Sequence, residues 1–369
     1  MFARRTFLFA SFFSAALSSL FLLSGPSLLD AGPIFSVQTL GSLGSSAGTV
    51  SAINNSGVTV GFVTNIQGNQ VPVSFNGGQA NALSGYGQAN GVNGTGTVVG
   101  TSFTNNVPSV TEWSNGQTTN LHIPGYGVAI NSAGQVAGGY ETSNLMLHAF
   151  EWSGGNFVDL GTLGGTWSSA NGINSLGQVV GTSTTHSGAF DAFFSSGSGM
   201  VGLGTLGGAN SYGMGINNAG QVVGSAQTSQ GSMNASIWNG GKAKDLGTLG
   251  GSQSYAYGLN DSATVVGSSW MAGNLVMHGF VDTDGVMIDL NQLIPVNSGW
   301  TIDAAYGIND SGDIIGTGML LGQSYALELV PSCELPTETP EPSTFLLGGI
   351  GMIALWSVRR SKRTKQASL

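Results

Sequence analysis

Apolar and polar positions along this chain alternate in a pattern that returns about every 43 residues. The clearest copy is Gly172–Gly181, in which a short run ends in Ile-Asn, an Asn-x-x-Gly stretch follows, and an apolar β-branched run closes the motif. Seven copies occur, at spacings of 39, 38, 43, 43, 43 and 49 residues. Their asparagines are Asn54, Asn93, Asn131, Asn174, Asn217, Asn260 and Asn309. A near-constant period of this length is typical of a repeat architecture.

Each repeat contains four short strand-like runs. Asn-x-x-Gly places Asn and Gly at the first and fourth positions of a type I turn, where the Asn side chain can accept a backbone hydrogen bond. An apolar run such as Gln178–Gly181 comes next, followed by one such as His148–Gly155 and then one such as Asp159–Gly161. Four strands joined by Gly and Asn turns within about 40–45 residues predict one blade of a β-propeller.

The two ends of the repeat region predict that the ring closes. The last repeat ends with the strand-like run Tyr325–Leu329, and no fourth strand follows it. A run of the missing type, Val37–Gly44, instead stands before the first repeat. Pairing of the two runs would hide two sheet edges. We therefore expect an all-β fold, a seven-bladed β-propeller of four-stranded antiparallel blades that spans residues 34–330.

The first 31 residues have the pattern of a signal peptide with a helical apolar segment. Basic Met1–Arg5 precedes the uncharged, apolar run Thr6–Leu23. Arg4-Arg5 also resembles a twin-arginine signal, whereas the very apolar run favours the general secretory route. An uncleaved N-terminal membrane anchor is the alternative.

Charge is scarce and one-sided in the repeat region. Residues 32–342 carry 17 acidic residues and two lysines, a net charge of −15. The negative electrostatic potential of this region repels phosphate backbones, so nucleic-acid binding is not expected. The one cysteine, Cys333, cannot form a disulfide within the chain, and strand pairing and burial must hold the fold.

The C-terminal region has three parts after a linker at residues 331–339. Pro340-Glu341-Pro342 is followed by the apolar run Phe345–Val358 and by the basic cluster Arg359–Arg363. The apolar run is short for a transmembrane helix, and the basic cluster would stay cytoplasmic. This order resembles the PEP-CTERM sorting signal of Gram-negative bacteria over residues 340–363, with a six-residue tail at 364–369 and Thr339 where Val is common.

The resemblance implies recognition and processing by exosortase during export, with transient anchoring in the inner membrane and a final location at the cell surface or outside the cell. The residues of the signal are Pro340, Glu341, Pro342, Arg359 and Arg360. An ordinary C-terminal membrane anchor is the alternative.

The repeats themselves resemble the HAF family of extracellular repeats. His148-Ala149-Phe150 together with Asp159–Gly165 carries the resemblance, and His278–Phe280 and Asp245–Gly251 repeat it in part. The first two repeats depart from the pattern. The resemblance implies an exported repeat protein and no particular reaction.

Candidate catalytic and cofactor motifs are weak. Gly202–Gly207 fits G-x-G-x-x-G, but a strand rather than a helix follows it, so no dinucleotide site is expected. Gly44–Gly48 fits G-x-S-x-G without the strand–turn–helix setting of a nucleophile. Asp282–Gly285 resembles part of a calcium loop, but a hairpin turn is favoured. No metal or cofactor is predicted.

Periodic residues are interpreted as parts of the blades rather than as catalytic groups. Three sets share repeat positions: His148 and His278; Asp159, Asp245 and Asp289; and Trp113, Trp152 and Trp238.

Two functions remain. The first is a non-enzymatic surface or matrix protein that binds extracellular polysaccharide. The alternative is a secreted propeller enzyme, a hydrolase or lyase acting on glycans, with carboxylates in the central mouth. No non-periodic carboxylate pair occurs, which favours the first.

A candidate binding face follows from the strand order. The Asn-x-x-Gly and Trp-x-x-Gly turns are short and should occupy one face, and the longer, variable loops should occupy the other. Variable loops on a rigid scaffold usually carry binding, and aromatic rings suit sugar stacking. The candidate residues are Trp167, Tyr212, Tyr255, Trp270 and Trp300. The alternative is that these rings cap the blades and pack inward.

Overall fold

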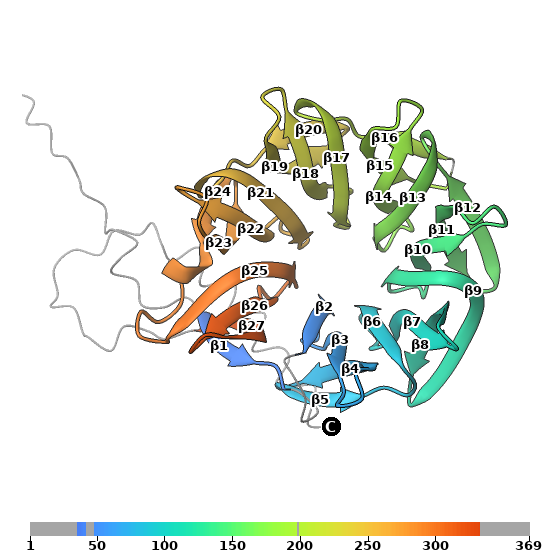
Figure 1. Ribbon diagram of the computed structural model, residues 1–369, viewed down its shortest axis with the longest axis horizontal. Helices are drawn as coiled ribbons and strands as arrows, with labels where there is room; N and C mark the ends of the chain where they lie inside the picture. Colours follow the sequence, from blue (N-terminus) through green and yellow to red (C-terminus); the bar gives the residue numbers. More distant parts are fainter. Residues whose placement is uncertain (1–34, 42–47, 198, 333–369) are drawn as a thin grey trace, which may run out of the picture. The chain divides into compact units, whose positions relative to one another are not determined.

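The computed structural model describes residues 35–41, 48–197 and 199–332. These residues belong to one compact unit, Pro33–Glu334. They form a ring of antiparallel β-sheets around a central opening (Figure 1). Helical structure in this part of the chain is limited to the short 3-10 turn η2 (Leu290–Gln292). The expected signal helix, the sorting helix and the motif at Gly44–Gly48 lie wholly or largely outside the described residues.

Five of the sheets have four strands, and four of these are continuous in sequence. Within each, the first strand lies innermost and the fourth lies outermost (Figure 1). Their strands are β2 (Thr49–Ile53), β3 (Thr59–Thr64), β4 (Gln70–Asn76) and β5 (Gln79–Ala82); β13 (Gly164–Ile173), β14 (Val179–Thr185), β15 (Phe190–Ser195) and β16 (Met200–Gly202); β17 (Gly207–Ile216), β18 (Val222–Thr228), β19 (Met233–Asn239) and β20 (Lys242–Asp245); β21 (Gly250–Leu259), β22 (Val265–Met271), β23 (Met277–Thr283) and β24 (Val286–Asp289).

The fifth four-stranded sheet joins the two ends of the described chain. It contains β25 (Trp300–Ile308), β26 (Ile314–Leu320), β27 (Gln323–Pro331) and β1 (Phe35–Thr39). β1 pairs antiparallel with β27, from Phe35 opposite Pro331 to Thr39 opposite Leu327. The predicted closure by an N-terminal strand is confirmed, although the strand begins at Phe35 and ends at Thr39.

A sixth sheet has seven strands, in the order β12-β11-β10-β9-β8-β7-β6. Its strands are β6 (Gly87–Val92), β7 (Val98–Thr104), β8 (Val107–Ser114), β9 (Gln117–Ile130), β10 (Val136–Glu141), β11 (Leu147–Ser153) and β12 (Asn156–Gly161). The long strand β9 pairs with β8 through its first half and with β10 through its second. The prediction of seven separate four-stranded blades was therefore wrong in this part of the ring.

The long strand goes with a shorter connection between units. Between the third and fourth repeat units, Gly161 and Gly164 adopt positive φ angles of 72° and 96° and turn the chain from one sheet to the next. Within β9, His122 takes the place of Gly161 and also has a positive φ, 59°. The stretch from His122 to Asn131 is four residues shorter than that from Gly161 to Asn174, so one strand runs from one unit into the next.

The repeated asparagines form a closed ring of hydrogen bonds. Each Nδ2 donates to the backbone carbonyl of the asparagine in the next unit, at 2.8 to 3.3 Å, and Asn309 returns to Asn54 at 3.2 Å. Each Oδ1 accepts the backbone N–H groups two and four residues ahead, as at Asn217 from Ala219 and Gln221. All seven are buried. Repetition of Asn-x-x-Gly is thus explained by contacts within and between units.

The Val-Val-Gly run that follows each turn packs the second strand closely against the first. Its valines are buried, as at Val179 and Val180. A Cβ on Gly181 would lie 2.0 Å from the carbonyl oxygen of Ser169 on the inner strand, so a side chain is excluded there. The periodic Trp113 and Trp238 are also buried, and Trp152 packs against a core cluster, as predicted.

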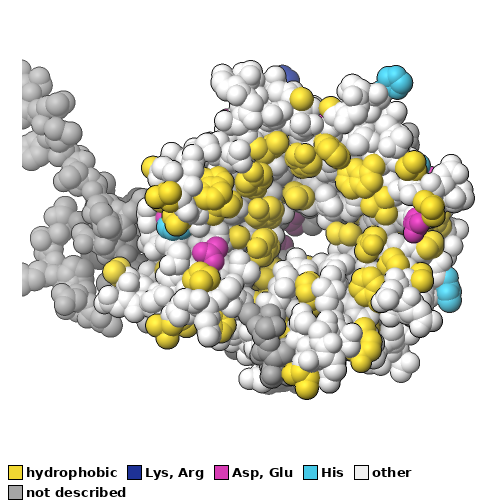
Figure 2. Space-filling view, viewed as in Figure 1, with side chains coloured by type: hydrophobic (Ala, Val, Ile, Leu, Met, Phe, Trp, Pro, Cys, Tyr) yellow, Lys and Arg dark blue, Asp and Glu magenta, His cyan; other side chains and the backbone are white. Residues whose placement is uncertain are grey.

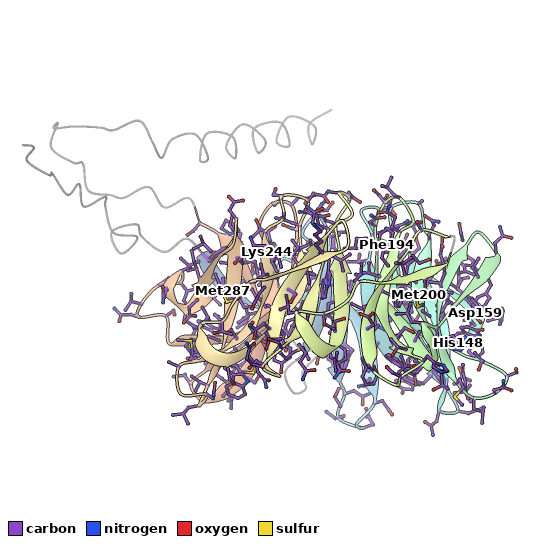
Figure 3. All side chains as sticks on the ribbon, turned by 90° about the horizontal axis from the view of Figure 1, so that it is seen from above. His148, Asp159, Phe194, Met200, Lys244 and Met287 are labelled. Atoms are coloured by element: carbon purple, nitrogen blue, oxygen red, sulfur yellow. The ribbon has the colours of Figure 1, made fainter. Side chains whose placement is uncertain are left out.

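Two faces of the ring are distinguished below. The turn face carries the seven turns that begin at Asn54 through Asn309 and the turns between third and fourth strands. The loop face carries the connections between second and third strands, such as Thr185–Phe190, and those between units. Figure 3 shows the ring from the side, with Phe194 toward the turn face and His148 toward the loop face. Because β27 runs toward the turn face, the described chain begins and ends there.

Candidate functional site

The five predicted binding residues lie in strands rather than in loops. Trp167, Tyr212, Tyr255 and Trp300 belong to inner strands and Trp270 to β22. Trp167, Trp270 and Trp300 lie toward the loop-face ends of their strands, whereas Tyr212 and Tyr255 lie in the middle of theirs. All five are partly exposed. Tyr212 and Tyr255 each precede the repeated asparagine by five residues, so these two share a repeat position.

Trp167 and Tyr212 are brought together by a third ring, Phe190. Phe190 meets Trp167 edge-on, with centroids 5.9 Å apart, and stacks on Tyr212 at 5.6 Å. Desolvation by burial, followed by the neighbouring Tyr212, raises the pKa of Tyr255. The Tyr255 hydroxyl donates to Gln253 Oε1 at 2.6 Å. Trp167, Phe190 and Tyr212 are thus joined by ring contacts, and Tyr255 lies on the next inner strand, β21, without a ring contact to them among the described residues. We call these four rings the aromatic series.

Trp300 and Trp270 do not join this series through any ring contact among the described residues. Trp300 packs on the core cluster around Ile302 and meets Tyr325 edge-on at 5.7 Å. Trp270 lies opposite Met277 in the sheet. Trp300 therefore fits the alternative stated from the sequence, in which the ring packs inward.

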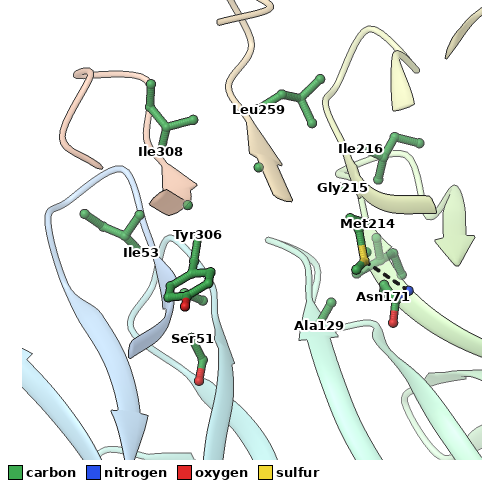
Figure 4. Close-up of a pocket in the computed structure, with 15 residues that line it drawn as sticks. Ser51, Ile53, Ala129, Asn171, Met214, Gly215, Ile216, Leu259, Tyr306 and Ile308 are labelled. Carbon is green, nitrogen blue, oxygen red and sulfur yellow. Dashed lines mark hydrogen bonds between the residues drawn. The ribbon is translucent and has the colours of Figure 1, made fainter. Parts of the chain in front are cut away.

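Hydrophobic side chains also gather around the central opening of the ring (Figure 2), where a pocket lies. The wall is made by inner strands and includes Ser51, Asn171, Met214 and Tyr306 (Figure 4). Asn171 Nδ2 donates to the carbonyl oxygen of Gly213 at 2.7 Å. No Asp, Glu, Lys, Arg or His is among the described residues that line this pocket.

A second ring pair extends the series along the wall. Tyr257 and Tyr306 lie with centroids 5.5 Å apart. The pKa of Tyr257 is raised, first by desolvation and then by Tyr306 and Tyr255, whereas its hydrogen bond to Ser268 opposes the rise. Our sequence reasoning missed Phe190, Tyr257 and Tyr306. An alignment of the position three residues before each asparagine would have shown Tyr257 and Tyr306.

The histidine–aspartate pairs join the third and fourth strands of a unit near the point where the chain passes to the next unit. His148 Nδ1 lies 3.1 Å from Asp159, and His278 Nδ1 lies 2.7 Å from Asp289. Asn234 takes the same place beside Asp245. Burial alone would raise the pKa of Asp159, but the Gly161 N–H, His148 and Tyr140 together hold it below its usual value.

A serine of the next unit hydrogen-bonds the backbone beside such a pair. Ser168 Oγ accepts from the Ala149 N–H at 2.8 Å and donates to the carbonyl oxygen of Gly161. Ser254 repeats both contacts two units further on, with Ala235 and Gly247. The His-Ala-Phe and Asp-Leu-Gly runs are therefore explained by contacts between units.

The remaining motifs are turns and strands. Gly202–Gly207 connects β16 to β17, so no helix follows it. Asp282–Gly285 is the hairpin between β23 and β24, in which the Gly285 N–H donates to Asp282 Oδ1 at 3.0 Å. Among the described residues, no three His, Cys, Asp or Glu side chains come close enough to hold a metal ion. Nor does this part of the chain contain a helix long and apolar enough to cross a membrane.

Comparison with solved structures finds matches at low sequence identity. TolB from Acinetobacter baumannii is 12% identical with a TM-score of 0.46, covering 75% of this chain, which spans 64% of that protein's length. AofleA from Arthrobotrys oligospora is 11% identical with a TM-score of 0.34, covering 81% of this chain and 90% of AofleA. No curated protein matches the chain in sequence.

The C-terminal region gives a specific match. Residues 338–362 match the PEP-CTERM protein-sorting motif, as the order of Pro340, Glu341, Pro342 and the basic Arg359 and Arg360 led us to expect. The match to HAF repeats stays a resemblance of the sequence. By its sorting motif, this chain is an exported propeller protein of the kind that exosortase sorts across the membrane of Gram-negative bacteria.

Proposed function

We propose that this protein is a non-enzymatic propeller of the cell surface or extracellular matrix that binds a neutral polysaccharide. The observation that carries the proposal is the aromatic series, in which Phe190 links Trp167 to Tyr212 across two strands. The rings of the series are partly exposed, and the pocket in the central opening is lined by no Asp, Glu, Lys, Arg or His among the described residues.

The chemistry of the surface supports a neutral sugar polymer. Aromatic faces cover the apolar C–H groups of sugar rings, and hydroxyl and amide groups such as Ser51 and Asn171 can bond the sugar hydroxyls. The net charge of −15 over residues 32–342 disfavours anionic polymers. The absence of a carboxylate or histidine among the side chains that line the opening supports binding rather than hydrolysis, because glycosidases generally use a carboxylate pair.

The direction of the chain supports display of the loop face. β1 begins and β27 ends at the turn face, so the aromatic series lies opposite the point where the described chain starts and stops. A chain attached through its C-terminal region would leave the loop face open to polymer.

We further propose that the seven-stranded sheet acts as two blades that share β9, which gives a seven-bladed ring. Support comes from the asparagine ring, in which Asn93 and Asn131 make the same contacts as the others.

A glycan array with the exported body tests the binding proposal. The parent should bind neutral polysaccharides, and a Trp167→Ala/Tyr212→Ala variant should lose at least about tenfold in affinity because two stacking faces are removed. Phe157→Ala is the matched control, because Phe157 is an exposed ring on a different strand, β12. Lack of binding by a folded parent, or equal binding by the double variant, contradicts the proposal.

Processing is tested separately by mass spectrometry of surface-extracted protein. We expect no peptide that spans Pro342 to Val358, because exosortase processing should remove or modify the sorting signal. Recovery of that intact peptide from mature protein would show that the signal is retained.

A further inference from the structure

A second pocket lies on the turn face, between the first two repeat units. It has a volume of about 380 Å³, within the size range of small-molecule sites. Ser74 lines one wall, and Trp113, Ser114, Asn115 and Gln117 line the other. Asn115 and Gln117 are exposed, so the pocket reaches the surface.

The pocket exists because one repeat carries a small residue where another carries a large one. Trp113 and Trp238 occupy the same repeat position, and their indole N–H groups donate to the equivalent carbonyls of Ser84, at 2.9 Å, and Gly204, at 3.3 Å. Beside Trp238, the side chain of Phe194 packs against the core cluster.

The residue that corresponds to Phe194 beside Trp113 is Ser74. Phe194 lies opposite Val180 in its sheet, and Ser74 lies opposite Val60, which occupies the same repeat position. Replacement of a phenyl ring by a hydroxymethyl group leaves the space unfilled. Figure 3 shows where Phe194 lies in the junction that is filled.

Two of the hydroxyl groups around the pocket already have partners, Ser84 with Thr118 and Ser114 with Thr97, but other polar groups are available. Within the described residues, no other side chain or backbone group hydrogen-bonds the Ser74 hydroxyl or the Gln117 amide. Asn115 Nδ2 donates only a long bond, 3.4 Å, to Ser114 Oγ. No charged side chain lines the pocket.

We propose that this pocket binds a small, neutral, hydroxyl-rich molecule such as a monosaccharide. Hydroxyl and amide groups on two walls can both donate to and accept from sugar hydroxyls, and the aliphatic side chains of Val58 and Leu83 cover the apolar side of such a ring. The site lies on the face opposite the aromatic series and does not depend on it.

Saturation-transfer NMR with glucose, galactose, mannose, fucose and N-acetylglucosamine tests this site. At least one sugar should give a signal with the parent. Measured in the Trp167→Ala/Tyr212→Ala background, which removes the proposed polysaccharide surface, Ser74→Phe should abolish that signal, since the ring occupies the space that Phe194 fills at the other junction. Ser74→Ala, which keeps the space, should weaken binding by no more than about tenfold, the worth of one hydrogen bond.

Two further variants keep the outcome interpretable. Trp167→Ala/Tyr212→Ala should leave the turn-face signal unchanged, which separates this site from the proposed polysaccharide surface. If Ser74→Phe does not fold, Asn115→Ala/Gln117→Ala, at exposed positions, should reduce the signal by about tenfold or more. The proposal is overturned if no sugar binds the parent. It is also overturned if Ser74→Phe, or Asn115→Ala/Gln117→Ala in its place, binds sugar as well as the protein without that change.

Discussion

The turn face and the loop face of this ring are built on different principles. On the turn face, all seven units carry the same buried asparagine with the same bond to the next unit. On the loop face, aromatic residues occur in some units and not in others: Tyr212 corresponds to Ser169 in the preceding unit and to Ala304 in the last. The comparison teaches that the repeated positions hold the scaffold together, whereas the positions that vary are where a ligand can be recognised.

The largest expected effect comes from removing β1, the outer strand of the closing sheet. It tests whether the ring of asparagine hydrogen bonds keeps the propeller closed without this strand. Deletion of residues 35–41 removes β1 and the buried side chains of Phe35 and Leu40, and it exposes the edge of β27. We expect a loss of about 5 kcal/mol in the free energy of unfolding, from two buried side chains and one strand's hydrogen bonds. Urea denaturation measures it. An unchanged urea midpoint would mean that the asparagine hydrogen bonds keep the ring closed without β1.

The scaffold was largely predictable from sequence because its contacts repeat. Asn-x-x-Gly, Val-Val-Gly and the split ends correctly predicted antiparallel strands, their order and the closing pair of β1 with β27. The error at β9 was avoidable, because the stretch from His122 to Asn131 is four residues shorter than the equivalent stretch from Gly161 to Asn174.

The candidate site was less predictable, because its contacts join different units. Phe190 stands in a position with no repeated aromatic, and its importance appears only when the fold places it between Trp167 and Tyr212. The pocket at Ser74 could be found only by comparison with Phe194 across two junctions.

A matched pair of asparagines separates contacts within a turn from contacts between units. Asn217 and Asn65 each accept two backbone N–H groups through Oδ1, but only Asn217 is buried and also donates to the next unit. Asn217→Ala should cost about 3 kcal/mol, and Asn65→Ala about 1 kcal/mol. Denaturant unfolding of both variants measures the difference. Equal costs would show that the bond between units adds nothing.

The last repeat unit provides an exception on the turn face that depends on pH. In the third unit, Gln135 donates to Glu151 at 2.8 Å, whereas the last unit has Asp313 in place of Gln135, close to buried Glu328. Desolvation by burial, and then the charge of Asp313, raise the pKa of Glu328 to about 7. Since the protonated form is favoured in the folded state, stability should be highest below about pH 4.5 and should fall as the pH rises through 7.

Glu328→Gln should remove this loss. We expect the variant to be more stable than the parent by about 2 kcal/mol at pH 8, with the gap closing toward pH 4. Thermal unfolding across this pH range measures it. Glu151→Gln is the control, because Gln135 already supplies a donor there, and its effect should be smaller. A constant difference between parent and Glu328→Gln at every pH would refute the titration.

The smallest expected effect on stability is that of removing Phe190, which we compare with Phe193 three residues further along β15. Phe193 is fully buried in the core, whereas Phe190 is partly exposed between Trp167 and Tyr212. Phe193→Ala should cost about 4 kcal/mol, the usual range for a core ring, whereas Phe190→Ala should cost only about 1 kcal/mol. Phe190→Ala should nevertheless reduce polysaccharide binding, because Trp167 and Tyr212 lose the ring that lies between them. Similar unfolding costs for the two variants would place Phe190 in the scaffold, and the distinction between the two faces would then fail in this unit.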